Sequence, residues 1–337
     1  MEAIKMEGIK LYAGLDVHKE FIVGTIKDEK GNLVRFQRVT TNEDGAKQLF
    51  YGLNNVNAVF EAGRNWTYIN SLIKPFCNEV IMAHPLKVKA IASARIKTDS
   101  IDSNILSDLL RADLIPQSNM PSQNIVDLRE ILRHRNFMVQ MTTQLKNKCH
   151  AILAREGKSF STPWGIRSNS RMSKIMTNSI YQRELNDIIE QIDFLKKKID
   201  TVNGDIKKKE MDYPEVDLLK SIPGISTYSA LLILAEIDNI SRFPSPNKLA
   251  AYAGLVPSTY QSGNSCYQGK ITKQGSKALR WILIQCTKTS IKKKHRLQTF
   301  YLRIKQKKGG QKATVATARK MLTTIWHLLV KNEYYIP

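Results

Sequence analysis

The sequence lacks the features that would place a protein in a membrane. It contains no run of about 18 apolar residues, which is roughly the length a spanning helix needs. Residues 1–10 mix acids and bases and contain no apolar stretch like that of a secretory signal peptide. The abundance of Lys, Ile and Asn is typical of an AT-rich bacterial genome. We therefore expect a cytoplasmic, bacterial protein without a membrane span.

Cysteine is also scarce. The four cysteines, Cys77, Cys149, Cys266 and Cys286, are scattered, with no Cys-x-x-Cys pair and no His at ligand spacing. This spacing argues against a zinc site and against a disulfide framework. We interpret the four thiols as buried or incidental.

Acidic residues are missing from a long C-terminal stretch. Residues 239–332 contain no Asp or Glu but 19 Lys and Arg, and the whole chain carries a formal net charge of +22. A solvated basic face usually keeps some acids, so the imbalance indicates a polyanionic partner. Nucleic acid is the simplest such partner, and the resulting protein would be associated with the nucleoid; an anionic membrane is the rival. Turns and apolar runs within the stretch predict a folded domain rather than a basic tail.

The N-terminal region has the pattern of a mixed α/β sheet. Short apolar runs predict strands, and helical patterns separate the later ones. The expected strands are 11–17, 21–26, 33–39, 57–60 and 79–83, and the expected helices are 66–74, 86–94 and 99–112. An opening meander followed by strands that alternate with helices is compatible with an RNase H-like fold.

The middle of the chain is predicted to be helical. A helical pattern covers 125–155, and residues 157–173 are rich in Ser, Asn, Gly and Pro, which predicts a loop. Apolar residues from Tyr181 to Ile206 then alternate steps of four and three, which is the seam of a coiled coil. Two partners fit this seam: a second copy of the chain, or residues 125–155 in an intramolecular hairpin. After Tyr213-Pro214, we expect a mostly helical C-terminal domain.

Four acidic residues stand where metal chemistry would need them. Asp16 and Glu61 each end a predicted strand, and Asp99 and Asp102 are spaced to share one face of a predicted helix. Hard oxygen ligands with no His or Cys nearby suit Mg²⁺ or Mn²⁺, and two such ions can activate and stabilise the oxygens of a phosphodiester. Taken alone, Asp99 could be only a helix cap.

These residues carry a family resemblance. The segments Gly14–Lys19, Glu61–Gly63, Pro85–Val88 and Lys97–Asp102 resemble the RuvC-like domain of DEDD insertion-sequence transposases, the insertion-sequence 110 family. The resemblance implies that Asp16, Glu61, Asp99 and Asp102 are catalytic residues that bind the divalent metal. Ser103 departs from the alanine common in that family, without touching the implied ligands.

The C-terminal half carries two further signatures. Leu219–Ile225, followed by Ala230–Leu232, resembles a helix-hairpin-helix, whose backbone N–H groups can hold a DNA phosphate. This assigns Gly224, Ile225 and Ser226 to nucleic-acid binding. Ser226 stands where a second glycine is usual, and a plain corner between two helices is the alternative. Ala251–Pro257 and Gln261–Gly263, with Gly269–Lys273 beyond, resemble the C-terminal signature of the same family.

The family places a serine nucleophile in this segment, and Ser262 is the best-matched position, ahead of Ser258 and Ser265. A serine hydroxyl is a weak nucleophile that needs activation, and the segment itself offers no base. Metals on the four acids could supply that activation if the domains close on each other. The cations that would stabilise phosphate charge are Lys270, Lys273, Lys277 and Arg280.

The prediction is therefore a transposase or recombinase in three parts. Residues 1–155 form a RuvC-like catalytic domain, 156–213 a helical, coiled-coil linker, and 214–337 a basic domain that carries the serine. The resemblance further implies element-end and target DNA, a structured guide RNA, and a homo-oligomer, dimer or tetramer, assembled through the linker. The rivals are a junction resolvase or DNA invertase, a non-catalytic nucleic-acid-binding protein, and an actin-like sugar kinase, which would need glycine-rich phosphate loops that are not found here.

Overall fold

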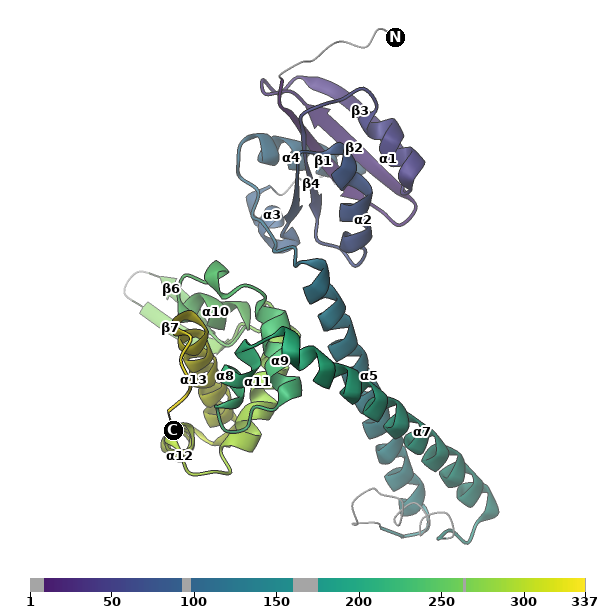
Figure 1. The fold of residues 1–337 in the computed structure, drawn as a ribbon, viewed down its shortest axis with the longest axis vertical. Coiled ribbons are helices and arrows are strands. Elements are labelled where there is room, and N and C mark those ends of the chain that lie inside the picture. The colour runs from purple at the N-terminus through teal and green to yellow at the C-terminus, as the bar shows by residue number, and fades with distance from the viewer. Residues whose placement is uncertain (1–8, 93–97, 160–174, 263–264, 337) are drawn as a thin grey trace. The chain divides into compact units, whose positions relative to one another are not determined.

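The computed structural model describes residues 9–92, 98–159, 175–262 and 265–336. Within this part of the chain, residues divide into two compact units, one up to Met120 and one from Pro121. The first unit is an α/β sheet and the second is mostly helical (Figure 1). No helix among the described residues is long and apolar enough to cross a membrane.

The first unit is built on a five-stranded sheet in the order β3-β2-β1-β4-β5. β1 (Leu11–Val17), β2 (Phe21–Lys27) and β3 (Leu33–Thr40) form an antiparallel meander. β4 (Val56–Glu61) and β5 (Glu79–Ala83) continue the sheet in parallel with β1. This order confirms the predicted mixed α/β sheet and is consistent with an RNase H-like fold.

Helices cover both faces of this sheet. On one face, α1 (Glu43–Phe50) and α2 (Trp66–Ile73) contribute Leu49, Phe50 and Ile69 to a core that includes Leu15 and Phe60. On the other face, α4 (Asp99–Arg111) packs its leucines against Val59 and Ala83. The short helices η1 (Lys74–Phe76) and α3 (Pro85–Ile91) flank β5 along the chain. Residues 93–97, before α4, lie outside the described residues.

The second unit begins with two long helices that pack against each other in opposite directions. These are α5 (Gln123–Ala154) and α7 (Ser179–Lys209). Cys149 and Ile152 near the end of α5 meet Leu185 and Ile188 near the start of α7. Further along, Arg135 donates a hydrogen bond of 3.0 Å to Asn203.

The predicted coiled-coil seam therefore faces α5 of the same chain. Its buried members include Leu185, Ile192 and Leu195. Of the two partners that fit the heptad pattern, the structure shows the intramolecular one. The pattern thus gives no support of its own to a homo-oligomer through the linker. The packing of α7 against α5 also explains why α5 belongs to the second unit. The domain predicted from the sequence, in contrast, runs to residue 155.

The rest of the second unit is a helical domain around one core. Its elements are η2 (Glu210–Asp212), α8 (Glu215–Lys220), α9 (Thr227–Ile237), η3 (Ile240–Arg242), α10 (Pro246–Tyr252), α11 (Lys277–Ser290), α12 (Arg296–Lys308) and α13 (Gly310–Lys331). Helix α9 is buried almost throughout, and α11 and α13 pack around it with their apolar faces. This confirms the predicted mostly helical C-terminal domain.

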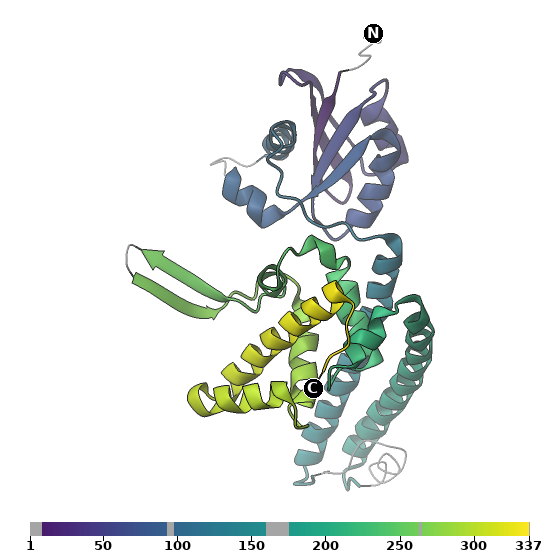
Figure 2. The same ribbon diagram turned by 60° about the vertical axis from the view of Figure 1, so that its left-hand side comes forward.

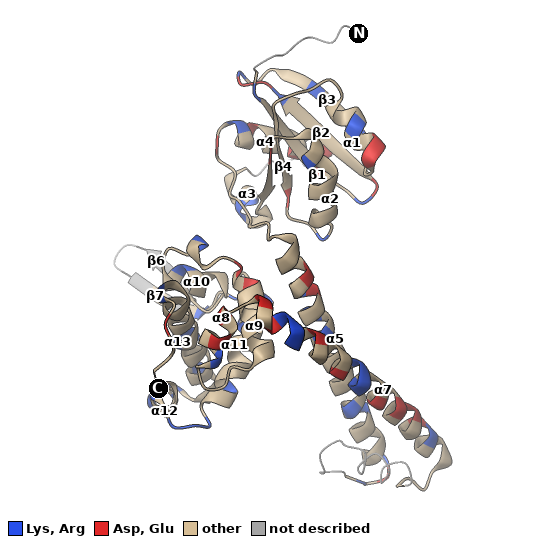
Figure 3. Ribbon diagram, viewed as in Figure 1, with Lys and Arg blue, Asp and Glu red and all other residues tan. Residues whose placement is uncertain are grey.

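One hairpin interrupts this helical domain. β6 (Pro257–Ser262) and β7 (Ser265–Ile271) pair antiparallel and project from the helices (Figure 2). The sequence analysis did not predict these strands, because their residues are mostly polar. Between α10 and α13, the described residues carry Lys and Arg but no acid, so the basic character predicted for this domain is displayed over several helices (Figure 3).

Candidate active site

Asp16 and Glu61 end neighbouring parallel strands. The register pairs Leu15 of β1 with Phe60 of β4, so the next residues along, Asp16 and Glu61, are adjacent. Side chains alternate between the faces of a sheet. Since Leu15 and Phe60 belong to the core under α1 and α2, Asp16 and Glu61 lie on the opposite face, which α4 covers.

Helix α4 brings the other two acids to this face. Its N-cap Thr98 accepts a hydrogen bond of 3.3 Å from the Ile101 nitrogen, so the helix begins at Asp99. Asp99 and Asp102 both lie in the first turn, where the helix dipole favours negative charge. Asp99 is therefore not the cap itself. The four carboxylates, Asp16, Glu61, Asp99 and Asp102, are brought to one end of one sheet face.

Small residues let α4 lie directly on β1. A methyl group added to Gly14 would overlap the backbone of α4 at Ser103 and Ser107. The Ser107 hydroxyl donates a hydrogen bond of 2.9 Å to the Tyr12 carbonyl, and the Ser103 hydroxyl lies 2.8 Å from that of Thr25 on β2. Ser103, the departure from the family pattern, thus bonds α4 to the sheet, and these contacts set the position of Asp99 and Asp102.

His18 joins the carboxylates. Its Nε2 lies 3.1 Å from Asp16 Oδ2 and 3.5 Å from Asp99 Oδ1. The ring stacks on Phe21 at 4.5 Å between centroids, and the Arg38 guanidinium also lies over the Phe21 ring, at 3.6 Å. The sequence prediction of oxygen ligands with no histidine nearby is therefore wrong, because His18 contacts both Asp16 and Asp99. The sequence could have indicated His18 by its spacing of two residues from Asp16, because side chains two residues apart on a strand lie on the same face.

The electrostatics show that two of the acids, Asp99 and Asp102, act on a third, Asp16. Burial raises the pKa of the Asp16 carboxyl above its ordinary value of 3.8, the hydrogen bond and charge of His18 lower it, and the negative charges of Asp99 and Asp102 raise it again. Like charges at such short range repel unless a cation lies between them.

The donor set fits a divalent cation. Asp16, His18 and Asp99 each offer one ligand atom, and these atoms lie within 4.8 Å of one another. Carboxylate oxygens suit Mg²⁺ and Mn²⁺, and an imidazole is accepted more readily by Mn²⁺ than by Mg²⁺. Among the described residues, Asp102 and Glu61 are not part of this group. Asp102 acts on Asp16 through its charge, and Glu61 is placed beside Asp16 by the strand register.

The predicted nucleophile lies on the hairpin of the second unit. Ser262 is the last residue of β6 and pairs with Ser265, the first of β7. Two glycines fix the base of this hairpin where the chain crosses itself. A methyl group on Gly254 would lie 2.7 Å from the Arg280 guanidinium, and one on Gly275 would overlap the Tyr252 carbonyl oxygen. Both glycines have positive φ, 65° and 95°.

The predicted phosphate-binding cations differ in their surroundings. Lys270, Lys273 and Lys277 are exposed. Arg280 is half-buried and donates a hydrogen bond of 2.9 Å to the Ala253 carbonyl, so it holds the base of the hairpin. Its predicted role at a phosphate therefore competes with a structural one.

The helix-hairpin-helix prediction falls on the turn between α8 and α9. Gly224 has φ 96° and packs against the backbone of α11, which explains the glycine. Ser226 caps α9, and its nitrogen donates a hydrogen bond of 2.7 Å to the Ser229 hydroxyl. Thr227, the first residue of α9, donates to the Glu210 carboxylate at 3.1 Å. Phosphate binding by Gly224, Ile225 and Ser226 stays a prediction, because internal groups already occupy donors at this turn.

Comparison with known families assigns this arrangement to a class, the DEDD transposases. A family model described as Transposase, of the DEDD type of IS110, matches residues 13–156, which include all four carboxylates. A second model, described as Transposase IS116/IS110/IS902 family, matches residues 216–302, which include the hairpin. The chain belongs to the IS110 family of DEDD transposases.

Individual relatives agree with this assignment. The chain is 28% identical to the transposase for insertion sequence element IS1111A of Coxiella burnetii, over 62% of this chain and 60% of that protein. It is 25% identical to the pilin gene-inverting protein of Moraxella bovis, over 96% of this chain and 97% of that protein. It is 24% identical to the transposase for insertion sequence element IS1328 of Yersinia enterocolitica, over 57% and 58%. These similarities support a DNA transposase or recombinase of a mobile element.

Proposed function

We propose that this chain cuts and rejoins the DNA of a mobile element by transesterification, with the four carboxylates as metal ligands and Ser262 as the nucleophile. The observation that supports the proposal most strongly is the convergence of the four carboxylates on one face of the first unit. A structural role does not account for three of them, because the charges of Asp99 and Asp102 raise the pKa of Asp16, and such like charges repel in the absence of a cation.

The proposed metal ligands come from two different elements of the first unit. Asp16 lies on β1, which is mostly buried. Asp99 and Asp102 lie on α4, which Ser103 and Ser107 bond to the sheet. Mg²⁺ or Mn²⁺ bound there would stabilise negative charge on the oxygens of a DNA phosphodiester. His18 stands against Asp16 and Asp99 and orients their oxygens.

The serine step is a balanced exchange of phosphate ester bonds. The Ser262 Oγ attacks the phosphorus, the new O–P bond forms, and the bond to one DNA strand breaks. The serine proton is lost, and the departing strand oxygen gains a proton to become a hydroxyl. A hydroxyl of the partner strand then attacks the phosphoserine, which joins the strands and restores the serine.

The remaining parts of the proposal concern partners. The basic surface from α10 to α13 would contact phosphates, including Lys270 of the hairpin and Lys273 and Lys277, which follow it along the chain. The charge fits DNA together with a structured guide RNA. A homo-oligomer supplies the several active sites that cutting two duplexes requires, and sedimentation of the chain with and without DNA tests it.

A second candidate function is site-specific DNA inversion. The similarity to the pilin gene-inverting protein of Moraxella bovis spans almost the whole of both chains. Inversion and transposition share the chemistry of strand exchange and differ in the arrangement of their DNA sites. A plasmid assay with element ends in inverted orientation distinguishes them, since inversion keeps the plasmid intact and transposition moves the element.

Covalent trapping tests the proposed chemistry. The full chain is incubated with Mg²⁺, element-end DNA and co-expressed RNA, and denatured samples are examined for a protein–DNA adduct, with and without RNase. The parent should give an adduct, whereas Ser262→Ala and Asp102→Asn should give none. Loss of the adduct after RNase treatment would support the guide RNA.

Two neighbouring serines provide matched controls. Ser258→Ala and Ser265→Ala remove a hydroxyl from the same hairpin, and both should retain the adduct. If Ser262→Ala retains it and Ser265→Ala loses it, the nucleophile is misassigned. If nicking persists in Ser262→Ala without any adduct, the chain is a metal-dependent hydrolase of the junction-resolvase kind, and the serine chemistry is wrong.

A further inference from the structure

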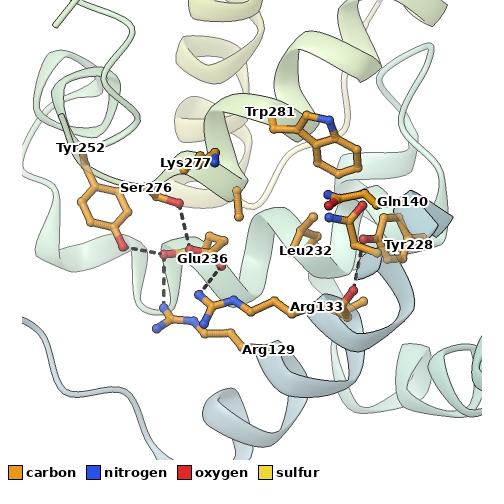
Figure 4. A pocket seen from close by; sticks show the side chains of 13 residues that line it. Arg129, Arg133, Gln140, Tyr228, Leu232, Glu236, Tyr252, Ser276, Lys277 and Trp281 are labelled. Atoms are coloured by element: carbon orange, nitrogen blue, oxygen red, sulfur yellow. Dashed lines mark hydrogen bonds and ion pairs between the residues drawn. The ribbon is translucent and has the colours of Figure 1, made fainter. Parts of the chain in front are cut away.

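A pocket in the second unit has, apart from Lys277, no residue with a part in the chemistry proposed above. It has a volume of about 500 Å³, within the usual range for a site that holds a small molecule. Tyr252 of α10 and Ser276 line part of it, and three helices form the rest of its walls. The lining residues on these three helices recur at helical spacing. They are Arg129, Arg133, Asn136 and Gln140 on α5, Tyr228, Leu232 and Glu236 on α9, and Lys277 and Trp281 on α11. Figure 4 shows the Trp281 ring on one side and Arg129 and Arg133 beside Glu236 on the other.

The acidic residue in the pocket is neutralised. Glu236 is 3% exposed, and its carboxylate accepts hydrogen bonds of 2.9 Å from both Arg133 and the Ser276 hydroxyl. Arg129 donates to the Ala235 carbonyl at 2.7 Å. Arg133 thus compensates the negative charge of Glu236. The exposed Lys277 and the remaining N–H donors of the half-exposed Arg133 then make the opening of the pocket favourable for an anion such as phosphate.

One polar atom in the wall is left without a partner. The Asn136 Oδ1 is buried and accepts no hydrogen bond from the described residues. A buried acceptor without a donor costs about 1–3 kcal/mol. A ligand that brings an N–H group to this oxygen would recover that cost. Gln140, one turn further along α5, lines the same wall with a second amide.

The apolar part of the lining suits a flat ring. Trp281 and Leu232 are both lining residues and belong to the edge of the domain core. Tryptophan side chains stack with unpaired bases of single-stranded nucleic acid. Asparagine and glutamine amides pair with the edge of adenine, where an amino group donates and a ring nitrogen accepts.

We propose that this pocket binds one unpaired adenine nucleotide of a single strand, with the ring against Trp281, the amino group donated to Asn136 Oδ1, and the phosphate near Lys277 and Arg133. The proposal deepens the proposed function, on which it rests, because it assigns a nucleobase-specific contact to a protein otherwise expected to bind phosphates. RNA and DNA share this chemistry, so either strand could supply the nucleotide.

Binding of short homopolymers tests the pocket. Fluorescence anisotropy compares oligoadenylate with oligothymidylate in the deoxy series, and oligoadenylate with oligouridylate in the ribo series, using the full chain. The parent should prefer oligoadenylate, and the series with the larger preference identifies the sugar. Asn136→Leu and Gln140→Leu should each reduce that preference by about 5- to 150-fold, the discrimination of a good amide–base pair, and leave binding of the other homopolymer unchanged.

The control is Asn147→Leu, the same substitution at an exposed position of α5. It should keep the preference. Asn136→Leu should also unfold no more easily than the parent, because the lost oxygen has no internal partner. Equal binding of both homopolymers by the parent, or an unchanged preference in both pocket variants, would overturn the pocket while leaving nucleic-acid binding intact. If the parent binds none of these single strands but binds duplex element-end DNA, the pocket is wrong and the proposed function stands; if it binds neither, the proposed function is contradicted as well.

Discussion

The close approach of α4 to β1 leads to a sharp prediction for Gly14→Ala. The added methyl group would overlap the Ser103 carbonyl oxygen and the Ser107 nitrogen, both in the backbone of α4. Backbone atoms of a helix cannot turn aside as a flexible side chain can. The helix must therefore withdraw from β1, and Asp99 and Asp102 withdraw from Asp16 with it.

The size of the effect follows from this geometry. Restoring a van der Waals separation of about 3.5 Å requires α4 to move by more than about 1 Å. Overpacking of this kind costs about 1–3 kcal/mol of unfolding free energy. A metal site tolerates displacements of only about 0.2 Å in its ligand distances. We therefore expect a folded variant, less stable in urea, whose affinity for Mn²⁺ falls by about tenfold or more, measured by calorimetric titration.

Gly204→Ala is the matched control. Gly204 lies within α7, and a methyl group there would meet nothing within 4 Å. It should bind Mn²⁺ like the parent and gain about 1 kcal/mol of stability, because alanine favours a helix. If Gly14→Ala has the parent's stability and the parent's Mn²⁺ affinity, α4 does not set the positions of its two carboxylates.

Three further predictions concern other residues. The pKa of Asp16 is raised in the folded state, so the folded state holds the proton of this carboxyl more tightly than the unfolded state does. Its contribution to the free energy of unfolding is therefore fully present below about pH 3.8 and is lost as the pH rises through the raised pKa. Asp16→Asn should therefore melt higher than the parent at neutral pH in chelator, and an equal or lower melting temperature would contradict this. Gly275→Ala places a methyl group against the Tyr252 carbonyl at φ 95° and should cost about 1–3 kcal/mol in urea unfolding; an unaltered midpoint would show that the hairpin base adapts. Lys270→Ala and Lys273→Ala should each lower the salt dependence of DNA binding by about one unit of the logarithmic slope, and an unchanged slope would remove them from the interface.

The fold of the first unit could be predicted because its strands bury apolar residues in short, well-bounded runs. β1, β3 and β5 lie close to the expected ranges. Helix α1 escaped prediction because it is only 8 residues long and half of it is polar. The seam of α7 was visible in the sequence, but its partner was not, because a heptad pattern fixes a buried face without specifying what covers it.

The site was predictable to a similar extent. Strand ends and helical spacing identified the four carboxylates, and the family models cover all of them. His18 was missed because a single histidine next to a strand has many structural explanations until its distances to Asp16 and Asp99 are known. The pocket at Asn136 could not be predicted from the sequence either, because its walls come from helices that are far apart in the sequence.

The central claim is that the four carboxylates form one metal site, and Mn²⁺ binding tests it most directly. The full chain and the single variants Asp16→Asn, Glu61→Gln, Asp99→Asn and Asp102→Asn are titrated under identical conditions, with Asp108→Asn as a control from the far end of α4, where the carboxylate bonds Lys27 instead. The account predicts tight binding by the parent and the control, and weakened binding by each of the four variants. Binding that is unaffected by Asp99→Asn and Asp102→Asn would contradict it.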